Sequence, residues 1–225
     1  NKKKLLDLQK KSNQNFYLTN QYINKKIDFY RTNLLNVKIK KNNIKVLKSR
    51  LKIIHITNFN ERHNGRLFFN TGRRINNGLI RLGHSVLEFS DRDIVSNHRK
   101  LNDFNGSKYL NKKLLSVIGN YNPDLVILGH ADLIDIKTLK LIKEYYPNIK
   151  FSQWFLDKMD SNWTSNKKRF LDKLDIMDAN FCTTDPSVLK FPKKKPIYYI
   201  PNPVDLSFDK LKNYEFKNLK NDVFF

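Results

Sequence analysis

The sequence contains a single cysteine, Cys182, among its 225 residues. No disulfide can therefore form within the chain, and a zinc or redox site built on cysteine ligands is excluded. No apolar run approaches the roughly 18–20 residues of a membrane-spanning helix, and no signal-peptide core follows the lysine-rich start. We expect a cytoplasmic protein that is soluble or bound peripherally to the inner face of a membrane.

Glycine is also scarce, with only 7 residues, and the GxGxxG pattern of dinucleotide-binding loops does not occur. Gly65 and Gly72 have the wrong spacing for it, and no Gly-Lys-Ser/Thr of a phosphate-binding loop follows them. A dinucleotide oxidoreductase and a P-loop NTPase are both disfavoured.

Acidic residues are few, because 21 Asp and Glu oppose 43 Lys and Arg, which gives a net charge of +22. Such a charge attracts nucleic acid and anionic lipid, so a non-enzymatic polyanion-binding protein is one alternative. Abundant Asn and Ile beside Lys also indicate an AT-rich coding sequence, which raises the charge without any such partner. Because no aromatic cluster or recognition motif accompanies the basic residues, nucleic acid is disfavoured as a partner.

Residues 1–50 contain no Gly or Pro, and their apolar residues recur at roughly helical spacing. They hold 14 Lys and Arg against Asp7 and Asp28. The pattern predicts a basic helical extension. It could bind an anionic membrane surface, or it could be a solvated helix with one packed face.

From Leu51 the pattern changes to short β-branched runs that alternate with helical stretches, which predicts βαβ units. The expected fold class is α/β, with a Rossmann-like doubly wound parallel sheet over residues 51–205. Gly83 and Asn122-Pro123-Asp124 are expected to end helices just before strands. We expect strands over Lys52–Thr57, Ser85–Phe89, Leu125–Leu128, Lys150–Trp154, Ala179–Thr183 and Ile197–Ile200, and helices near Gly72–Leu82, Lys108–Gly119, Ile136–Tyr145 and Asn166–Met177, with a helical turn near Pro186–Lys190.

Ligands of such sheets bind at the carboxyl ends of the strands, so the residues after each strand are the site candidates. The polar loop Asn58–Arg66 follows the first strand and can meet an anion or a sugar hydroxyl. Gly65 in this loop either makes a simple turn or lets the backbone approach a ligand. The candidate binding residues of the loop are Asn58, Arg62, His63, Gly65 and Arg66.

Two further strands deliver polar residues to the same edge. His130 and Asp132 follow Leu125–Leu128, and either could accept a proton from a hydroxyl nucleophile. Trp154 and Asp157 end the next strand, and an aromatic ring beside a carboxylate suits carbohydrate. Trp154 could instead be buried under a loop.

The segment Asp91-Arg92-Asp93 imitates the DxD metal-binding motif. Two spaced carboxylates are a weak metal signal, and we expect a solvated loop here. No metal site is predicted.

Several strings resemble parts of GT-B glycosyltransferases of the family 1/4-like type. Tyr199-Ile-Pro-Asn-Pro-Val-Asp205 resembles the hinge strand "IPN-x-VD" that closes the acceptor-side domain of that family. Gly83-His-Ser-Val86 resembles "GH-x-V", and Pro123-Asp-Leu-Val126 resembles "PD-x-V". Trp154-Phe-Leu-Asp157 and Asp222-Val-Phe-Phe225 are similar to segments of the spore-maturation-type branch.

The resemblance implies transfer of a sugar from a nucleotide-sugar donor to a carbohydrate, lipid-linked or other acceptor, with no metal and no further cofactor. Residues 51–205 would be the acceptor-side domain, with Asn202 and Asp205 at the hinge. Residues 206–225 would be a linker and the start of the donor-binding domain, whose remainder is absent, so this chain alone would be inactive. His130 or Asp157 would be the catalytic base of an inverting enzyme, whereas a retaining enzyme needs neither. Acceptor contacts would come from Asn58, Arg62, His63, Gly65, Arg66, Asp132 and Trp154.

Overall fold

A computed structural model describes residues 49–159, 164–186, 189 and 195–210. The chain divides between Lys48 and Ser49 into two units, and the described residues belong to the second. The predicted basic extension, except for its last two residues, lies outside the described residues. So do residues 211–225 of the predicted linker and donor-domain start, and most of the expected helical turn near Pro186–Lys190.

The described residues form one sheet of six parallel strands in the order β2-β1-β3-β4-β5-β6. Each predicted strand is present, and no strand end differs from the prediction by more than one residue. The α/β, Rossmann-like doubly wound fold is therefore confirmed. The strands are β1 (Lys52–Thr57), β2 (Ser85–Ser90), β3 (Leu125–Gly129), β4 (Lys150–Phe155), β5 (Ala179–Cys182) and β6 (Ile197–Tyr199).

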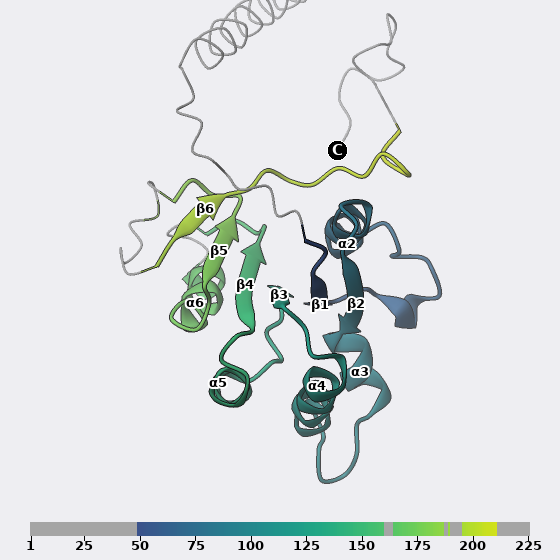
Figure 1. Cartoon of the computed structure of the whole chain (residues 1–225). Coiled ribbons are helices and arrows are strands. Elements are labelled where there is room, and N and C mark those ends of the chain that lie inside the picture. Colours follow the sequence, from purple (N-terminus) through teal and green to yellow (C-terminus); the bar gives the residue numbers. More distant parts are fainter. Residues whose placement is uncertain (1–48, 160–163, 187–188, 190–194, 211–225) are drawn as a thin grey trace, which may run out of the picture. The chain divides into compact units, whose positions relative to one another are not determined.

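Helices cover both faces of this sheet (Figure 1). On one face, α2 (Thr71–Arg81) packs Ile75 and Leu79 against Ile53 and Ile127. On the other face, the apolar side chains of α4 and α5 pack against the strand residues that alternate with Ile53 and Ile127, such as Ile54 of β1 and Val126 of β3. The remaining elements are η1 (Glu61–His63), α3 (Asp91–Asn97), α4 (Ser107–Tyr121), α5 (Ile136–Tyr145) and α6 (Thr164–Asp172).

The turns before two strands follow the sequence prediction. Gly83 has a φ of 87° after α2, and Asn122 has a φ of 48° after α4, so both adopt the left-handed conformation that ends helices. The Asp124 carboxylate then accepts a hydrogen bond from the Lys52 amide at 2.7 Å, which ties the start of β3 to the start of β1. Helix α6 was expected to continue to Met177 but ends at Asp172, in a series of turns.

The strand order reverses direction at β1, because β1 pairs with β2 on one side and with β3 on the other. Helix α2 leaves β1 on one face of the sheet, whereas α3 and α4 return to β3 on the opposite face (Figure 1). The carboxyl ends of β1 and β3 therefore border the crevice in which doubly wound proteins bind ligands.

The segment after β6 runs back across the carboxyl ends of the strands to α2 (Figure 1). The buried Asp205 carboxylate accepts hydrogen bonds from Asn77 Nδ2 and Arg81 Nη2, each at 2.7 Å. Asp209 forms a bidentate ion pair with Arg74, in which Nε donates to Oδ2 at 2.7 Å and Nη2 donates to Oδ1 at 2.8 Å. We call residues 200–210 the strap, because these contacts fasten it to α2.

Candidate functional site

A cleft of about 270 Å³ lies at the switch point, as the fold predicts. We call it the first cleft. Of the residues predicted from the sequence, it brings together Asn58, His130, Trp154 and Asp157. Its full lining is Thr57, Asn58, Asn70, Thr71, Gly72, Arg92, His130, Trp154, Leu156, Asp157 and Arg169.

His130 is held in a fixed position beside Asp157. Its backbone has a φ of 50°, which is uncommon for a residue with a side chain. Its ring stacks on Phe155 with 4.1 Å between centroids, and its Nε2 accepts a hydrogen bond from the Leu156 amide at 3.1 Å. Because Nε2 accepts, the neutral ring carries its proton on Nδ1, which lies 3.5 Å from Asp157 Oδ2.

The two proton-acceptor candidates therefore differ in what they can do. Burial lowers the pKa of His130, although the charges of Asp157 and Asp132 oppose this shift, so the ring is neutral near pH 7. Its only lone-pair nitrogen is already occupied by the Leu156 amide. The side chain of Asp157 is 56% exposed and lines the first cleft. Asp157 is thus the group that a ligand hydroxyl can reach.

Arg169 of α6 borders the cleft and connects the acidic residues. Its Nη1 donates to Asp132 Oδ2 at 2.7 Å, and its Nη2 lies 3.9 Å from Asp157 Oδ2. Arg92 reaches the same Asp132 oxygen at 3.5 Å. Asp132 itself does not line the first cleft.

Trp154 is among the residues that line the cleft, but it is buried, with 5% of its surface exposed. Its Nε1 donates to His55 Nε2 at 3.1 Å. A Cβ atom on Gly129 would lie 1.9 Å from Trp154 Cζ2, so the ring packs directly on the end of β3. Of the two interpretations of Trp154, burial rather than ligand stacking describes this structure.

A buried polar network lies behind Trp154, and sequence reasoning missed it. The His55 Nδ1 contacts Asn76 Oδ1 at 3.2 Å, and the Asn76 amide donates to Glu88 at 2.6 Å, which also pairs with Arg73. Burial lowers the pKa of His55 to about 4, so this ring is neutral. The sequence signal that could have indicated this network was His55, which stands among the isoleucines of β1.

The Asn58–Arg66 loop contributes less than predicted, since only Asn58 lines the first cleft. Arg62 forms an ion pair with Asp93 at 2.6 Å instead. Gly65 has a φ of 85°, which favours glycine in this turn, and it does not line the first cleft. His63 and Arg66 are likewise absent from the cleft lining.

Gly72 permits close packing between a helix and a strand. A Cβ atom on Gly72 would meet Thr57 Cγ2 at 2.6 Å, so the first turn of α2 packs closely against the end of β1. This contact brings Asn70 and Thr71 to the first cleft. The Asn70 side chain caps α2 by accepting from the Arg73 amide at 2.9 Å.

The prediction of a solvated loop at Asp91-Arg92-Asp93 is wrong, because helix α3 begins directly after β2. Asp91 and Asp93 are 0% and 2% exposed. Asp93 accepts from Ser90 Oγ and from the Glu61 amide, so it fastens η1 to α3. Burial raises the pKa of Asp91 to about 6. Within the described part of the chain, no group of three or more His, Cys, Asp or Glu could hold a metal ion.

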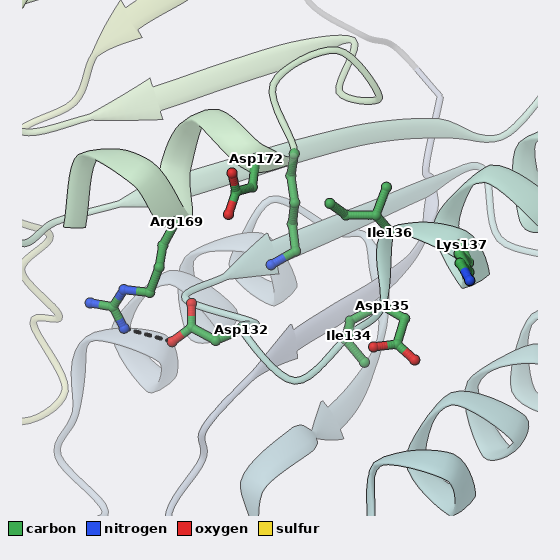
Figure 2. A pocket seen from close by; sticks show the side chains of 8 residues that line it. Asp132, Ile134, Asp135, Ile136, Lys137, Arg169 and Asp172 are labelled. Carbon is green, nitrogen blue, oxygen red and sulfur yellow. Dashed lines mark hydrogen bonds and ion pairs between the residues drawn. The ribbon is translucent and has the colours of Figure 1, made fainter. Parts of the chain in front are cut away.

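A second cleft of about 430 Å³ lies beside the first and shares Arg169 with it. It contains the predicted residue Asp132. Figure 2 shows Arg169 and Asp172 of α6 on one side, with Asp132, Ile134 and Asp135 of the β3–α5 loop on the other. The lining is completed by Ile136, Lys137 and Lys173.

The predicted hinge residues lie on the strap. Asp205 is buried against α2, whereas Asn202 is exposed. None of the described helices is long and apolar enough to cross a membrane.

The fold and the first cleft define a Rossmann-like α/β protein with a polar cleft at its switch point. Comparison with protein-family models and with curated proteins gave no match.

Proposed function

We propose that this chain is the acceptor-side domain of a GT-B glycosyltransferase that uses a nucleotide-sugar donor. The observation that carries the proposal is the exposed Asp157 carboxylate in a polar cleft at the switch point. The Thr71 hydroxyl in the same lining can donate and accept a hydrogen bond, as binding of a sugar hydroxyl requires, and the Asn58 amide keeps one N–H beyond its bond to Asn60. The Asn70 amide is occupied by Phe59, Leu67 and Arg73. The resemblance of residues 199–205 to the family's hinge strand supports the same function.

In an inverting reaction, Asp157 accepts the proton of the acceptor hydroxyl while that oxygen attacks the anomeric carbon of the donor. A carbon–oxygen bond forms, and the bond from this carbon to the diphosphate breaks. The nucleoside diphosphate leaves with the electron pair. His130 acts as a positioning residue, because its Nδ1–H faces Asp157 and its other nitrogen is tied to the Leu156 amide.

In a retaining reaction the departing diphosphate accepts the proton instead, and Asp157 only binds the acceptor. Neither His130 nor Asp157 is then a catalytic base. The donor would be held in both cases by a second domain, which the family resemblance expects after the hinge. The contacts of Asp205 and Asp209 with α2 support a hinge, because they lead the chain across the carboxyl edge of the sheet.

Polyanion binding is the alternative function, and net charge is its main support. Most arginines near the site already have acidic partners, which leaves them less available to phosphate groups. Ion pairs with Asp or Glu are formed by Arg62, Arg73, Arg74, Arg81, Arg92 and Arg169. Competition among heparin, duplex DNA and anionic vesicles tests this alternative, and binding should weaken steeply with salt if it is correct.

The proposal is tested by assaying the whole protein that contains this domain for turnover of UDP-sugars and GDP-sugars. For an inverting enzyme, Asp157→Asn should lower kcat about 10²- to 10⁴-fold. His130→Asn should lower it less and shift the pH profile. The matched control is Glu144→Gln, an exposed carboxylate on α5, and it should leave turnover unchanged. Absence of turnover with any donor would overturn the proposal, and normal turnover in both site variants would remove these two residues from it.

A further inference from the structure

The second cleft has a lining in which positive and negative charges balance. Three carboxylates, Asp132, Asp135 and Asp172, face three cationic side chains, Lys137, Arg169 and Lys173. An ionic ligand would therefore meet as many like charges as opposite ones, so the balance disfavours a phosphate or a polycation.

The same lining is rich in hydrogen-bonding groups that a neutral hydroxyl can use, since a hydroxyl both donates and accepts. Among the described residues, no hydrogen bond or ion pair engages the carboxylates of Asp135 and Asp172, and Asp135 makes no side-chain cap to α5. The partly exposed Ile136 adds apolar surface for C–H groups. The cleft volume of about 430 Å³ falls within the range of roughly 300–1,000 Å³ for small-molecule sites.

Arg169 joins this cleft to the first one, because it lines both. Its guanidinium group donates to Asp132, which lines the second cleft, and approaches Asp157, which lines the first (Figure 2 shows the contact with Asp132). A ligand that spans both clefts would pass this side chain, with one part beside Asp157 and the next part between α5 and α6.

We propose that the second cleft is a subsite for an additional sugar unit of the acceptor, so that the acceptor is a neutral glycan of at least two units. This inference rests on the proposed function, in which the reacting hydroxyl lies beside Asp157. The first cleft holds the terminal unit, and Asp135, Lys137 and Asp172 bind hydroxyl groups of the next unit.

Binding to the ¹⁵N-labelled chain of residues 1–225, followed by NMR, tests the subsite without any turnover. The probes are glucose, N-acetylglucosamine, maltotriose, chitotriose and inorganic phosphate. At least one trisaccharide should shift amide signals near Asp135 and Asp172 and bind about tenfold more tightly than its monosaccharide, as expected for one or two added hydrogen bonds. Asp172→Ala should weaken that trisaccharide about three- to tenfold. The control Asp175→Ala removes an exposed carboxylate outside the cleft lining and should not change binding.

The inference is overturned if no trisaccharide binds more tightly than its monosaccharide, if the shifts are confined to the first cleft, or if phosphate binds the second cleft better than the sugars. It fails separately from the proposed function. Trisaccharide binding in both clefts by a whole protein that transfers no sugar would keep the subsite and reject the transferase. Turnover by a protein whose second cleft shows no amide shifts with any trisaccharide would keep the transferase and reject the subsite.

Discussion

His55 should make the folding stability depend on pH, because its ring is fully buried and neutral. The ring accepts a hydrogen bond from Trp154 Nε1, and a proton on the accepting nitrogen would break that bond. Burial lowers the pKa from 6.5 to about 4 in the folded protein. Between these two values the unfolded chain binds the proton and the folded chain does not, so stability falls as the pH is lowered from 6.5 to 4.

The expected magnitude follows from the size of this shift. One pKa unit corresponds to about 1.4 kcal/mol, so the full loss of unfolding free energy is about 3 kcal/mol by pH 4, and about 2 kcal/mol at pH 5. Above pH 6.5 the contribution no longer changes. Below pH 4 both states are protonated at His55, and the contribution is again constant.

Urea unfolding of the wild-type chain and of His55→Gln at pH 7.5 and pH 5 measures this effect. The glutamine amide can still donate toward Asn76 and accept from Trp154, but it does not titrate. We expect the wild type to lose about 2 kcal/mol more than the variant between the two pH values. Asp91 and His130 titrate in both proteins, so the difference isolates His55. Equal losses in the two proteins would refute the buried neutral histidine.

Three further substitutions test other contacts by urea unfolding or proteolysis. Gly129→Ala should destabilise the protein by about 3 kcal/mol, because the new methyl group would overlap the ring of Trp154. The control is Gly78→Ala in α2, where the new methyl group meets open space, and it should stabilise the protein by about 0.5–1 kcal/mol. Asp205→Ala should release the strap from α2 and speed limited proteolysis within residues 200–210; an unchanged cleavage rate would contradict the clamp. Asp91→Asn should stabilise the protein by up to about 3 kcal/mol at pH 7.5, because the carboxyl pKa is raised from 3.8 to about 6 and its ionised form is the one that burial destabilises. The gain should be much smaller at pH 4, and an equal effect at both pH values would contradict this.

The sheet could be predicted closely because its signal is local. Buried parallel strands are continuous β-branched runs, and Gly83 and Asn122-Pro123 mark the starts of two of them. Parallel strands place all their carboxyl ends at one edge, so strand order along the chain was enough to predict that Asn58, His130 and Asp157 come together.

Loop structure could not be predicted in the same way, because it depends on partners far apart in the sequence. Arg62 pairs with Asp93, 31 residues away, and this ion pair draws it away from the first cleft. The interpretation of Asp93 as part of a solvated loop overlooked a local signal, because Ser90-Asp-Arg-Asp93 has the spacing of a helix N-terminus and Ser90 is the N-cap residue of α3. The acidic pair that imitates a metal motif is therefore an anchor between α3 and η1.

The relation between His130 and Asp157 shows what tertiary structure adds to such a prediction. The sequence places a histidine and a carboxylate at the ends of neighbouring strands, and either could accept a proton. The left-handed backbone of His130 turns its Nε2 toward the Leu156 amide, 26 residues away. That single hydrogen bond occupies the lone pair that a general base would need, and it leaves the Nδ1 proton facing Asp157. Which of the two side chains has a free lone pair is thus set by a backbone group that no side-chain motif could have indicated.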